Sequence, residues 1–429
     1  MDISKSIDLK NAIELTKQKT IQPYIGLALL IAVVVFGALK SNVDQRLPLF
    51  LMTGLALGYI LTRSRYGFAG GFKRIYVTGE GSLSTALLVM FALSMVFAAT
   101  IQYSATMMGI DAPGLSSVKF LNISILLGGF IFGIGMMLAG GCASGTLSDL
   151  GEGAGRAMIA MSTFVLGSLP GLLAQDALNN SAIGQIGMKL YLPDVMGYVG
   201  AVIFSVLLLA GLYLVVRKYE KFRKKEGYFE ATVYEDQELP LPKQESPKLF
   251  SYATFHKIFV QRWSFMTGGI LLAIMFAFIL VTTGHSWGVT GPFVPWGVAF
   301  LQMFGIQFSS PVFADAVATV NGGILNDPGS LRNIGIILGA AIAFLLAGRF
   351  AFDRHFKLKD VSYYLIGGFL MGFGARLAGG CNIGALFSGI GNFSLSGWGF
   401  FLTLWLGGLL ALKVFAGKVN IIPPDRHQK

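Results

Sequence analysis

Cysteine and charged residues are the two classes that this sequence has least of. Only two of its 429 residues are cysteines, and only 13% are Asp, Glu, Lys or Arg. Two cysteines are too few for a secreted disulfide framework, and their surroundings do not resemble a zinc site. A chain that is 54% hydrophobic and so poor in charge is too apolar for an ordinary soluble protein. The composition therefore predicts a membrane protein without a metal or other cofactor.

Uncharged apolar runs recur along the whole chain, and most are long enough to cross about 30 Å of hydrocarbon as a helix. We expect about ten spans, at roughly residues 21–40, 47–62, 82–108, 120–142, 157–175, 195–216, 263–283, 331–348, 361–380 and 397–416. The polar first twenty residues are not followed by a convincing cleavage site, so the first span should be retained. The sequence predicts an all-α polytopic membrane protein.

The net charge of +11, from 33 basic and 22 acidic residues, does not indicate a nucleic-acid partner. Basic clusters follow apolar runs at residues 63–74, 217–227 and 349–359, whereas residues 309–330 contain acids but no Lys or Arg. Basic loops of membrane proteins stay on the cytoplasmic side. We therefore expect the three clusters and both termini to be cytoplasmic. The glycines and aromatics of the first cluster also predict that it dips back towards the membrane.

The long hydrophilic segment of the chain divides it in two. Residues 217–262 combine mixed charge with three prolines, which argues against a folded domain and for a cytoplasmic linker. The predicted organisation is a first membrane repeat at residues 1–216, the linker, and a second membrane repeat at residues 263–429.

One glycine-rich stretch occurs twice, at residues 128–147 and 367–386. Twelve of the twenty positions are identical, including the whole Leu-Ala-Gly-Gly-Cys-x-x-Gly core. The two cysteines of the chain, Cys142 and Cys381, occupy the same place in the two copies. Self-similarity of this kind indicates an internal duplication.

The expected topology places the two copies in opposite directions. With the amino terminus inside, the span before Cys142 runs inwards and the span before Cys381 runs outwards. An inverted-topology repeat with paired broken or re-entrant helices is the layout of many transporters, and their site lies near the middle of the membrane.

Each cysteine follows a pair of glycines, Gly140 and Gly141 in the first copy and Gly379 and Gly380 in the second. Glycine costs about 1 kcal/mol in a helix interior relative to alanine, so a pair favours a break. A break exposes backbone N–H groups, which favour anions. The cysteines add a polarizable, weakly donating S–H group. The motif thus predicts a site for a soft, sulfur-containing anion.

The chain also resembles the YeeE/YedE family of sulfur-transport membrane proteins. The resemblance covers most of the chain and rests on three motifs: Arg-x-Arg-Tyr-x-Phe-Ala-Gly-Gly-Phe-Lys at 63–73, Leu-Ala-Gly-Gly-Cys-Ala-Ser-Gly-Thr at 138–146 with Gly-Glu-Gly at 151–153, and Gly-Phe-Gly-Ala-Arg-Leu-Ala-Gly-Gly-Cys-Asn-Ile-Gly at 372–384. It implies an hourglass-shaped bacterial inner-membrane protein that takes up thiosulfate and passes it between cysteine thiols. It also implies a small cytoplasmic sulfur-carrier partner, similar to TusA.

By this resemblance, Cys142 and Cys381 are relay thiols, with Asn382 directly after the second. Thiosulfate-transporting members carry a third cysteine immediately before Phe68, where this chain has Gly67. Arg376 is more like the branch of the family linked by name to selenium metabolism, so a selenium compound is the alternative substrate.

Two charged residues near the motifs are further candidates. Arg376 stands in an otherwise uncharged segment, where an ionised side chain is costly and is expected to face an anion or a buried acid unless it snorkels to an interface. Two acids, Asp149 and Glu152, come after Cys142. Either can form an ion pair with Arg156 or take part in proton coupling. Alternatively, both can be capping charges at the membrane interface.

Two other interpretations stay open. The cysteines and the Gly-x-x-x-Gly spacings, at Gly129/Gly133 and Gly368/Gly372, can serve close helix packing alone. Alternatively, Cys142 and Cys381 can cycle as a disulfide in a membrane thiol-redox protein, although the chain has no Cys-x-x-Cys pair. The lack of a Gly-x-x-x-x-Gly-Lys-Ser/Thr motif argues against an ATP-driven pump. A transporter, not an enzyme, is the favoured interpretation.

Overall fold

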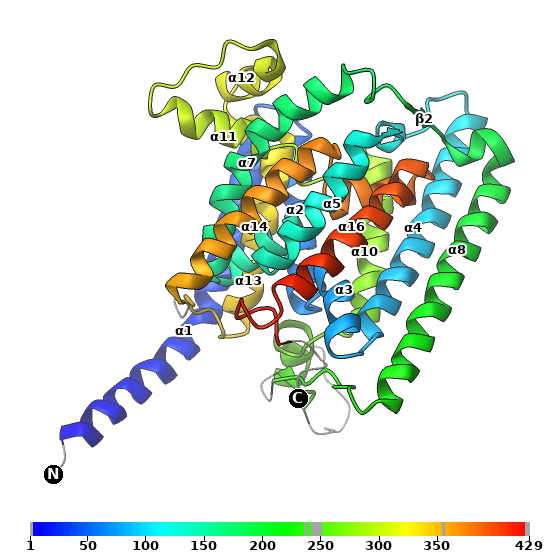
Figure 1. The fold of residues 1–429 in the computed structure, drawn as a ribbon. Helices are drawn as coiled ribbons and strands as arrows, with labels where there is room; N and C mark the ends of the chain where they lie inside the picture. The colour runs from blue at the N-terminus through cyan, green and yellow to red at the C-terminus, as the bar shows by residue number, and fades with distance from the viewer. Residues whose placement is uncertain (1–2, 236–237, 242–250, 354–356, 425–429) are drawn as a thin grey trace.

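The computed structural model describes residues 3–235, 238–241, 251–353 and 357–424. Helices make up nearly all of its regular structure, and ten of the described helical segments are long and apolar enough to cross a membrane. All ten predicted spans coincide with these segments. The protein is an all-α polytopic membrane protein (Figure 1).

The described residues of the first half form eight α-helices: α1 (Ile3–Lys40), α2 (Leu47–Arg63), α3 (Phe68–Val77), α4 (Ser82–Met107), α5 (Ile123–Ala139), α6 (Ala143–Glu152), α7 (Gly155–Asn179) and α8 (Leu192–Lys225). The second half contains α10 (Phe265–Thr283), α11 (Phe293–Gln302), α12 (Ala314–Asn321), α13 (Pro328–Leu346), α14 (Leu358–Leu377), the π-helix η6 (Asn382–Phe387), α15 (Ser388–Gly391) and α16 (Leu395–Val414). The short strands β1 (Phe120–Asn122) and β2 (Gly187–Lys189) pair antiparallel.

Several helices begin where the sequence supplies a capping side chain. The Asp327 carboxylate accepts the backbone N–H of Ser330 at the start of α13, and Pro328 occupies the first helical position. Asn122 caps α5 and Ser264 caps α10 in the same way. These caps satisfy N–H groups that the helix itself leaves free.

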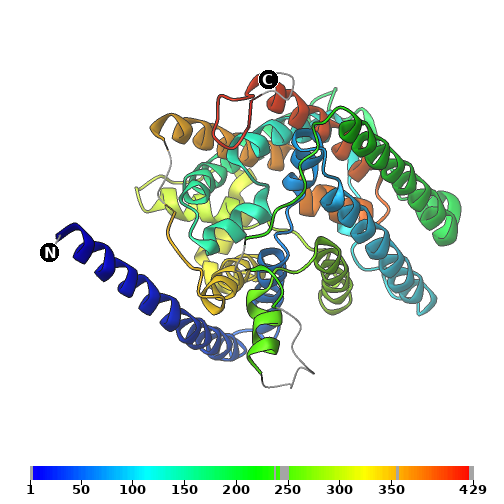
Figure 2. The same ribbon diagram turned by 90° about the horizontal axis from the view of Figure 1, so that it is seen from below.

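The main helix pairs each join one helix from the first half with one from the second. Helix α2 packs along α13, and α4 packs along α10. In the centre, α5 packs along α16, α7 packs along α14, and α5 and α14 contact each other. Helices α1 and α8 lie on opposite sides of this assembly (Figure 2).

Glycines permit the close approach of the central helices. A Cβ atom on Gly133 of α5 would lie 2.3 Å from the Leu404 carbonyl oxygen of α16, and one on Gly372 of α14 would lie 2.1 Å from the Phe164 carbonyl oxygen of α7. A Cβ atom on Gly128 would meet the Ala378 backbone nitrogen at 2.4 Å, where α5 approaches the end of α14. The Gly-x-x-x-Gly spacings therefore do serve packing, as one interpretation expected.

The molecule has two ends, which we name by what lies there. The Lys119 end contains β1, β2, α11 and α12, and the tail end contains the C-terminal segment 415–424 with the first turn of α14 (Figure 1). Helix α8 continues to Lys225, so the boundary expected after residue 216 falls inside a helix. The parts of the predicted linker at residues 236–237 and 242–250 lie outside the described residues.

Candidate functional site

The first Gly-Gly-Cys motif breaks a helix at the tail end. Helix α5 ends at Ala139 and is capped by Gly140, whose φ of 81° is a left-handed conformation that suits glycine. The chain then turns back into the protein, and Cys142 becomes the N-cap residue of the short helix α6. Its thiol is 1% exposed and lies 3.4 Å from the Ser144 hydroxyl.

The second motif repeats this geometry at the Lys119 end. Helix α14 is followed by Gly379, with a φ of 65°, and Cys381 is the N-cap residue of the π-helix η6. The Cys381 sulfur is fully buried and accepts the backbone N–H of Ile383 at 3.4 Å. Gly380 has no room for a side chain, because a Cβ atom there would lie 2.7 Å from the Ala385 backbone nitrogen.

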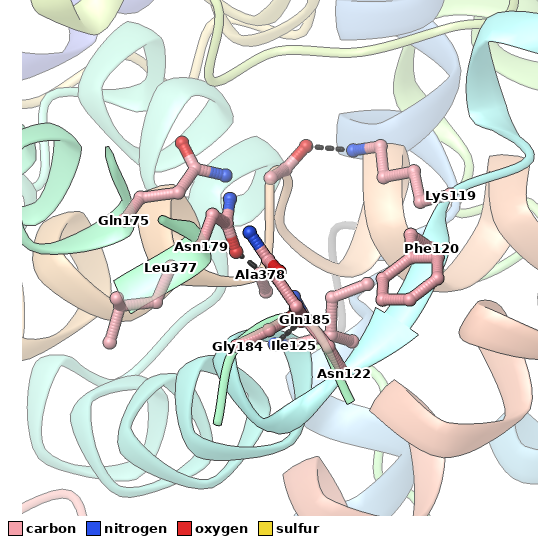
Figure 3. A pocket seen from close by; sticks show the side chains of 11 residues that line it. Lys119, Phe120, Asn122, Ile125, Gln175, Asn179, Gly184, Gln185, Leu377 and Ala378 are labelled. Atoms are coloured by element: carbon pink, nitrogen blue, oxygen red, sulfur yellow. Dashed lines mark hydrogen bonds between the residues drawn. The ribbon is translucent and has the colours of Figure 1, made fainter. Parts of the chain in front are cut away.

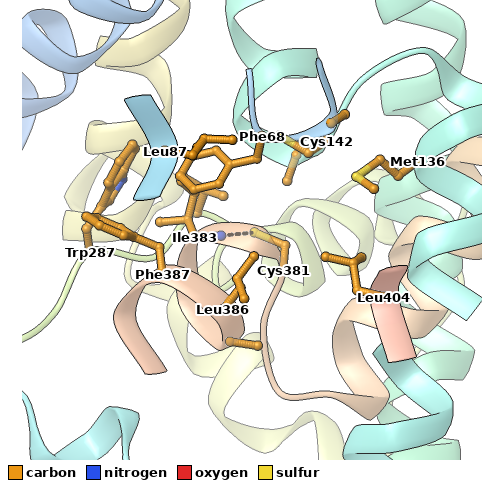
Figure 4. Packing of buried hydrophobic residues seen from close by; sticks show 14 of the residues in the cluster. Phe68, Leu87, Met136, Cys142, Trp287, Cys381, Ile383, Leu386, Phe387 and Leu404 are labelled. Carbon is orange, nitrogen blue, oxygen red and sulfur yellow. Dashed lines mark hydrogen bonds between the residues drawn. The ribbon is translucent and has the colours of Figure 1, made fainter. Parts of the chain in front are cut away.

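The two thiols meet the same buried cluster from opposite ends. Cys142 and Cys381 both belong to it, and Figure 4 shows Phe68 beside Cys142, and Ile383 and Leu386 beside Cys381. Both are free cysteines. Asn382 is fully buried beside them and donates from Nδ2 to the Met136 sulfur at 3.3 Å. The structure thus brings the two motifs together in the interior.

Aromatic side chains fill the space next to the thiols. Phe68, the first residue of α3, is 1% exposed, and its ring centroid lies 6.0 Å from that of Phe387. Phe387 also packs against Phe276 and Trp287. Gly67 caps α3 in an extended conformation, and a Cβ atom there would have no atom nearer than 3.9 Å. Helix α3 therefore begins in the buried interior, next to the thiols.

A cavity of about 500 Å³ opens at the Lys119 end (Figure 3). Its polar lining side chains are one cation, Lys119, and four neutral amides, and the remaining lining residues are apolar or glycine; the amides are Asn122, Gln175, Asn179 and Gln185. The Lys119 ammonium donates to the Gly379 carbonyl, two residues before Cys381. Burial, and then the nearby Arg376 guanidinium, lower the pKa of Lys119 to about 8.

A network of charges lies at the opposite end. Arg65 forms an ion pair with Glu152 at 2.8 Å and reaches Glu238 of the linker at 3.4 Å. Glu238 is also paired with Arg349. Burial alone would raise the pKa of Glu238, but the neighbouring Arg65 and Arg349 outweigh it and the pKa is lowered. Asp149, in contrast, pairs with Arg156 at 2.5 Å.

Arg376 binds backbone carbonyl groups. Its Nη2 atom donates to the carbonyls of Thr290 and Gly291. No ion pair between Arg376 and an acid occurs among the described residues, so the expected acidic partner is not found there. Arg376 also lines a smaller cavity of about 340 Å³ that contains Asp315 and Asp327.

Comparison with known proteins decides the family. The family model described as Sulphur transport matches residues 63–410, which is most of the chain. The chain belongs to the Sulphur transport family. It is 28% identical over 367 residues to the thiosulfate transporter TsuA of Spirochaeta thermophila, covering 81% of this chain and 92% of that protein. It is 25% identical over 348 residues to TsuA of Escherichia coli, covering 78% and 84%. A shorter match, 31% over 178 residues, is to the probable transporter YedE of Escherichia coli, covering 41% and 43%.

In this member of the Sulphur transport family, sequence reasoning missed two features of the site. Phe387 faces Phe68 from the π-helix, but in the sequence it is one apolar residue among many. Lys119 carried a usable signal, because it is an isolated basic residue directly before an apolar span on the side where few basic residues are expected.

Proposed function

We propose that this protein takes up a sulfur-containing anion, thiosulfate, across a bacterial inner membrane, and that the anion passes between the thiols of Cys142 and Cys381. The observation that carries the proposal is the meeting of these two free, buried thiols in one cluster, each at the N-cap of a short helix. Membership of the Sulphur transport family and two relatives named thiosulfate transporters support the substrate.

The proposal includes an inverted-topology repeat. Its support is that each helix pair has a counterpart in which the two halves of the chain have changed places. The pair α2 with α13 corresponds to α10 with α4, and the pair α5 with α16 corresponds to α14 with α7. The two Gly-Gly-Cys motifs start from opposite ends of the molecule, next to Arg156 in one case and Lys119 in the other. On this basis the Lys119 end faces outwards, and the tail end, where Arg65, Arg349 and the linker lie, faces the cytoplasm with both termini.

The anion enters the cavity at Lys119, whose ammonium attracts negative charge and whose amide neighbours offer hydrogen-bond donors. It then passes Cys381 and Cys142, where an S–H group is a weak donor that suits a polarizable sulfur. Phe68 and Phe387 pack against each other beside the thiols and bury them, so passage requires these rings to move. Weak donors at each step allow the anion to leave as readily as it binds.

At the tail end the Gly140 and Gly141 pair and the Arg65–Glu152 ion pair border the exit. A small sulfur-carrier protein similar to TusA is the proposed acceptor on that side. The selenium alternative uses the same path, because a selenium-containing anion is also soft and polarizable.

Uptake of labelled thiosulfate by cells that express the variants tests the proposal. Cys142→Ala and Cys381→Ala should each abolish most uptake with normal membrane insertion, because a methyl group cannot donate to the passing sulfur. The matched control is Gly211→Ala on α8, where a Cβ atom meets nothing within 4 Å. Wild-type uptake by the Cys142→Ala/Cys381→Ala variant would refute the thiol path and favour a packing role. A labelled selenium anion in the same assay separates the two substrates.

The thiol-redox alternative makes opposite predictions about reagents. If the thiols bind a passing anion, a thiol-blocking reagent stops uptake, whereas a reductant does not. An oxidised pair would need Cα atoms within about 7 Å and would block the path. Uptake that depends on cycles of oxidation would instead establish a redox protein.

A further inference from the structure

A second large cavity, of about 540 Å³, lies at the tail end, away from the two thiols. It is bordered by the last turn of α3, the end of α8 and the C-terminal segment, including Lys73, Val77, Arg223, Tyr228, Ile422 and Pro423. Neither cysteine and neither glycine pair lines it, so it is distinct from the path proposed above.

Arg223 is the most unusual residue of this cavity. Its side chain is 1% exposed, and its Nη2 atom donates to the Val77 carbonyl at 2.7 Å. Its Nε and Nη1 atoms have no hydrogen-bond partner among the described residues. Its guanidinium carbon lies 5.4 Å from the centre of the Tyr228 ring. A buried guanidinium with two unused donors is costly unless a negatively charged group completes it.

Lys73 supplies a second cation to the same cavity. Its ammonium donates to the Ile421 carbonyl, and it takes part in no ion pair found among the described residues. Neighbouring cations at this end do have carboxylate partners: Lys224 pairs with Glu220 at 2.7 Å, and Arg74 with Glu80 at 3.7 Å. Glu230 also lines the cavity but forms no ion pair with Lys73 or Arg223 in the described part of the chain.

The cavity lies next to the end of the first Gly-Gly-Cys motif. Ile421, whose carbonyl holds Lys73, places its Cδ1 atom 2.9 Å from the position of a Cβ atom on Gly140. Lys73 is also within electrostatic reach of Arg156, which stands beside Gly140. Lys73 therefore lies close to the end of the first Gly-Gly-Cys motif, where the proposed path leaves Cys142.

We propose that this cavity is a second anion site, in which Lys73 and Arg223 bind the oxygen atoms of a tetrahedral oxyanion. A planar guanidinium and an ammonium match sulfate, sulfonate or phosphate oxygens, which are harder than the sulfur that the thiols accept. The same chemistry fits the oxygens of transported thiosulfate and the phosphate of an anionic lipid headgroup. Its assignment to transported thiosulfate rests on the proposed function, whereas the site itself does not.

The test measures equilibrium binding of labelled sulfate and thiosulfate to the purified full-length protein. A background of Lys119→Gln and Cys142→Ala/Cys381→Ala removes the other candidate contacts. Lys73→Gln and Arg223→Gln should each weaken sulfate binding at least tenfold. Arg223→Lys is the second variant in case Arg223→Gln does not fold. Lys224→Gln, an exposed cation on the same helix as Arg223, should leave binding unchanged.

Binding in nanodiscs distinguishes the two sources of the anion. If sulfate binds equally well in phosphatidylcholine and phosphatidylglycerol discs, and Lys73→Gln abolishes it in both, the site takes the free oxyanion. If phosphatidylglycerol displaces sulfate and Lys73→Gln removes this competition, the site takes the headgroup phosphate.

The proposal of this anion site is wrong if Lys73→Gln and Arg223→Lys change neither sulfate binding nor its competition with lipid. The experiments also distinguish a failure of the proposed transport function from a failure of this anion site. A protein that transports no thiosulfate but binds sulfate through Lys73 refutes the proposed function alone. A protein that transports thiosulfate with its thiols, but shows no Lys73-dependent binding, refutes this site alone.

Discussion

The Arg65 guanidinium donates to the Glu152 carboxylate across 2.8 Å and so connects the loop before α3 to the end of α6. Both side chains are largely buried, at 26% and 13% exposed. Arg65 also has a φ of 50°, which is rare for a residue other than glycine. Since α3 begins with Phe68 and Cys142 is the N-cap residue of α6, this ion pair couples two segments that border the proposed path.

Replacing only Arg65 should lower stability and uptake more than replacing both Arg65 and Glu152. Arg65→Gln leaves a buried carboxylate without its main partner, and loss of one member of a buried pair costs about 3 kcal/mol. We expect Arg65→Gln to lower the melting temperature and the uptake, and Arg65→Gln/Glu152→Gln to recover part of both. Lys224→Gln, which breaks a more exposed pair, should change neither. Equal melting temperatures for the single and the double variant would contradict the coupling.

The restored family cysteine gives a second prediction. Gly67 is extended and has open space where a Cβ atom would lie, so Gly67→Cys should fold and should transport thiosulfate at least as fast as the unmodified protein. Gly58→Cys should fail to fold, because a Cβ atom there would lie 2.0 Å from the Ile336 carbonyl oxygen. Gly211→Cys adds a thiol away from the path and controls for nonspecific effects. Loss of all uptake in well-folded Gly67→Cys would mean that the substrate path needs the glycine.

The parts of this fold that follow from hydrophobicity were predictable from the sequence, and the parts that follow from tertiary contacts were not. Ten apolar runs with few charges predicted ten membrane-spanning helices, and the duplicated Gly-Gly-Cys motif predicted two broken helices. The sequence left the partner of Arg156 open between two acids; the structure pairs it with Asp149, seven residues away. Glu152 instead pairs with Arg65, which is 87 residues away, and no sequence pattern specifies such a contact.

Topology provides a third prediction. Lys224 lies in the last turn of α8, and Lys357 directly precedes α14, at the end of the molecule that also contains the C-terminal segment. Asp315 lies in α12 at the opposite end (Figure 1). Reporters fused near Lys224 and Lys357 should therefore be cytoplasmic, and one near Asp315 should be external. An external reporter at Lys357 would contradict the inverted-repeat proposal.

The last prediction concerns the pH dependence of uptake. Burial, followed by the proximity of Arg376, lowers the pKa of Lys119 from 10.5 to about 8. Below this value the ammonium is charged and attracts the anion; above it the amine is neutral and attraction is lost. One pH unit above a pKa leaves about a tenth of the groups protonated. Uptake should therefore fall several-fold between an external pH of 7 and 9.

Two variants of Lys119 show whether this residue causes the decline. Lys119→Arg keeps a positive charge throughout this range, because arginine stays protonated in proteins. Its uptake should therefore stay nearly constant from pH 7 to pH 9. Lys119→Gln has no charge at any pH, so its uptake should be low and equally flat. Initial uptake rates in cells with a buffered interior provide the measurement. A decline in Lys119→Arg as steep as in the unmodified protein would assign the titration to another group and would remove Lys119 from the entry step.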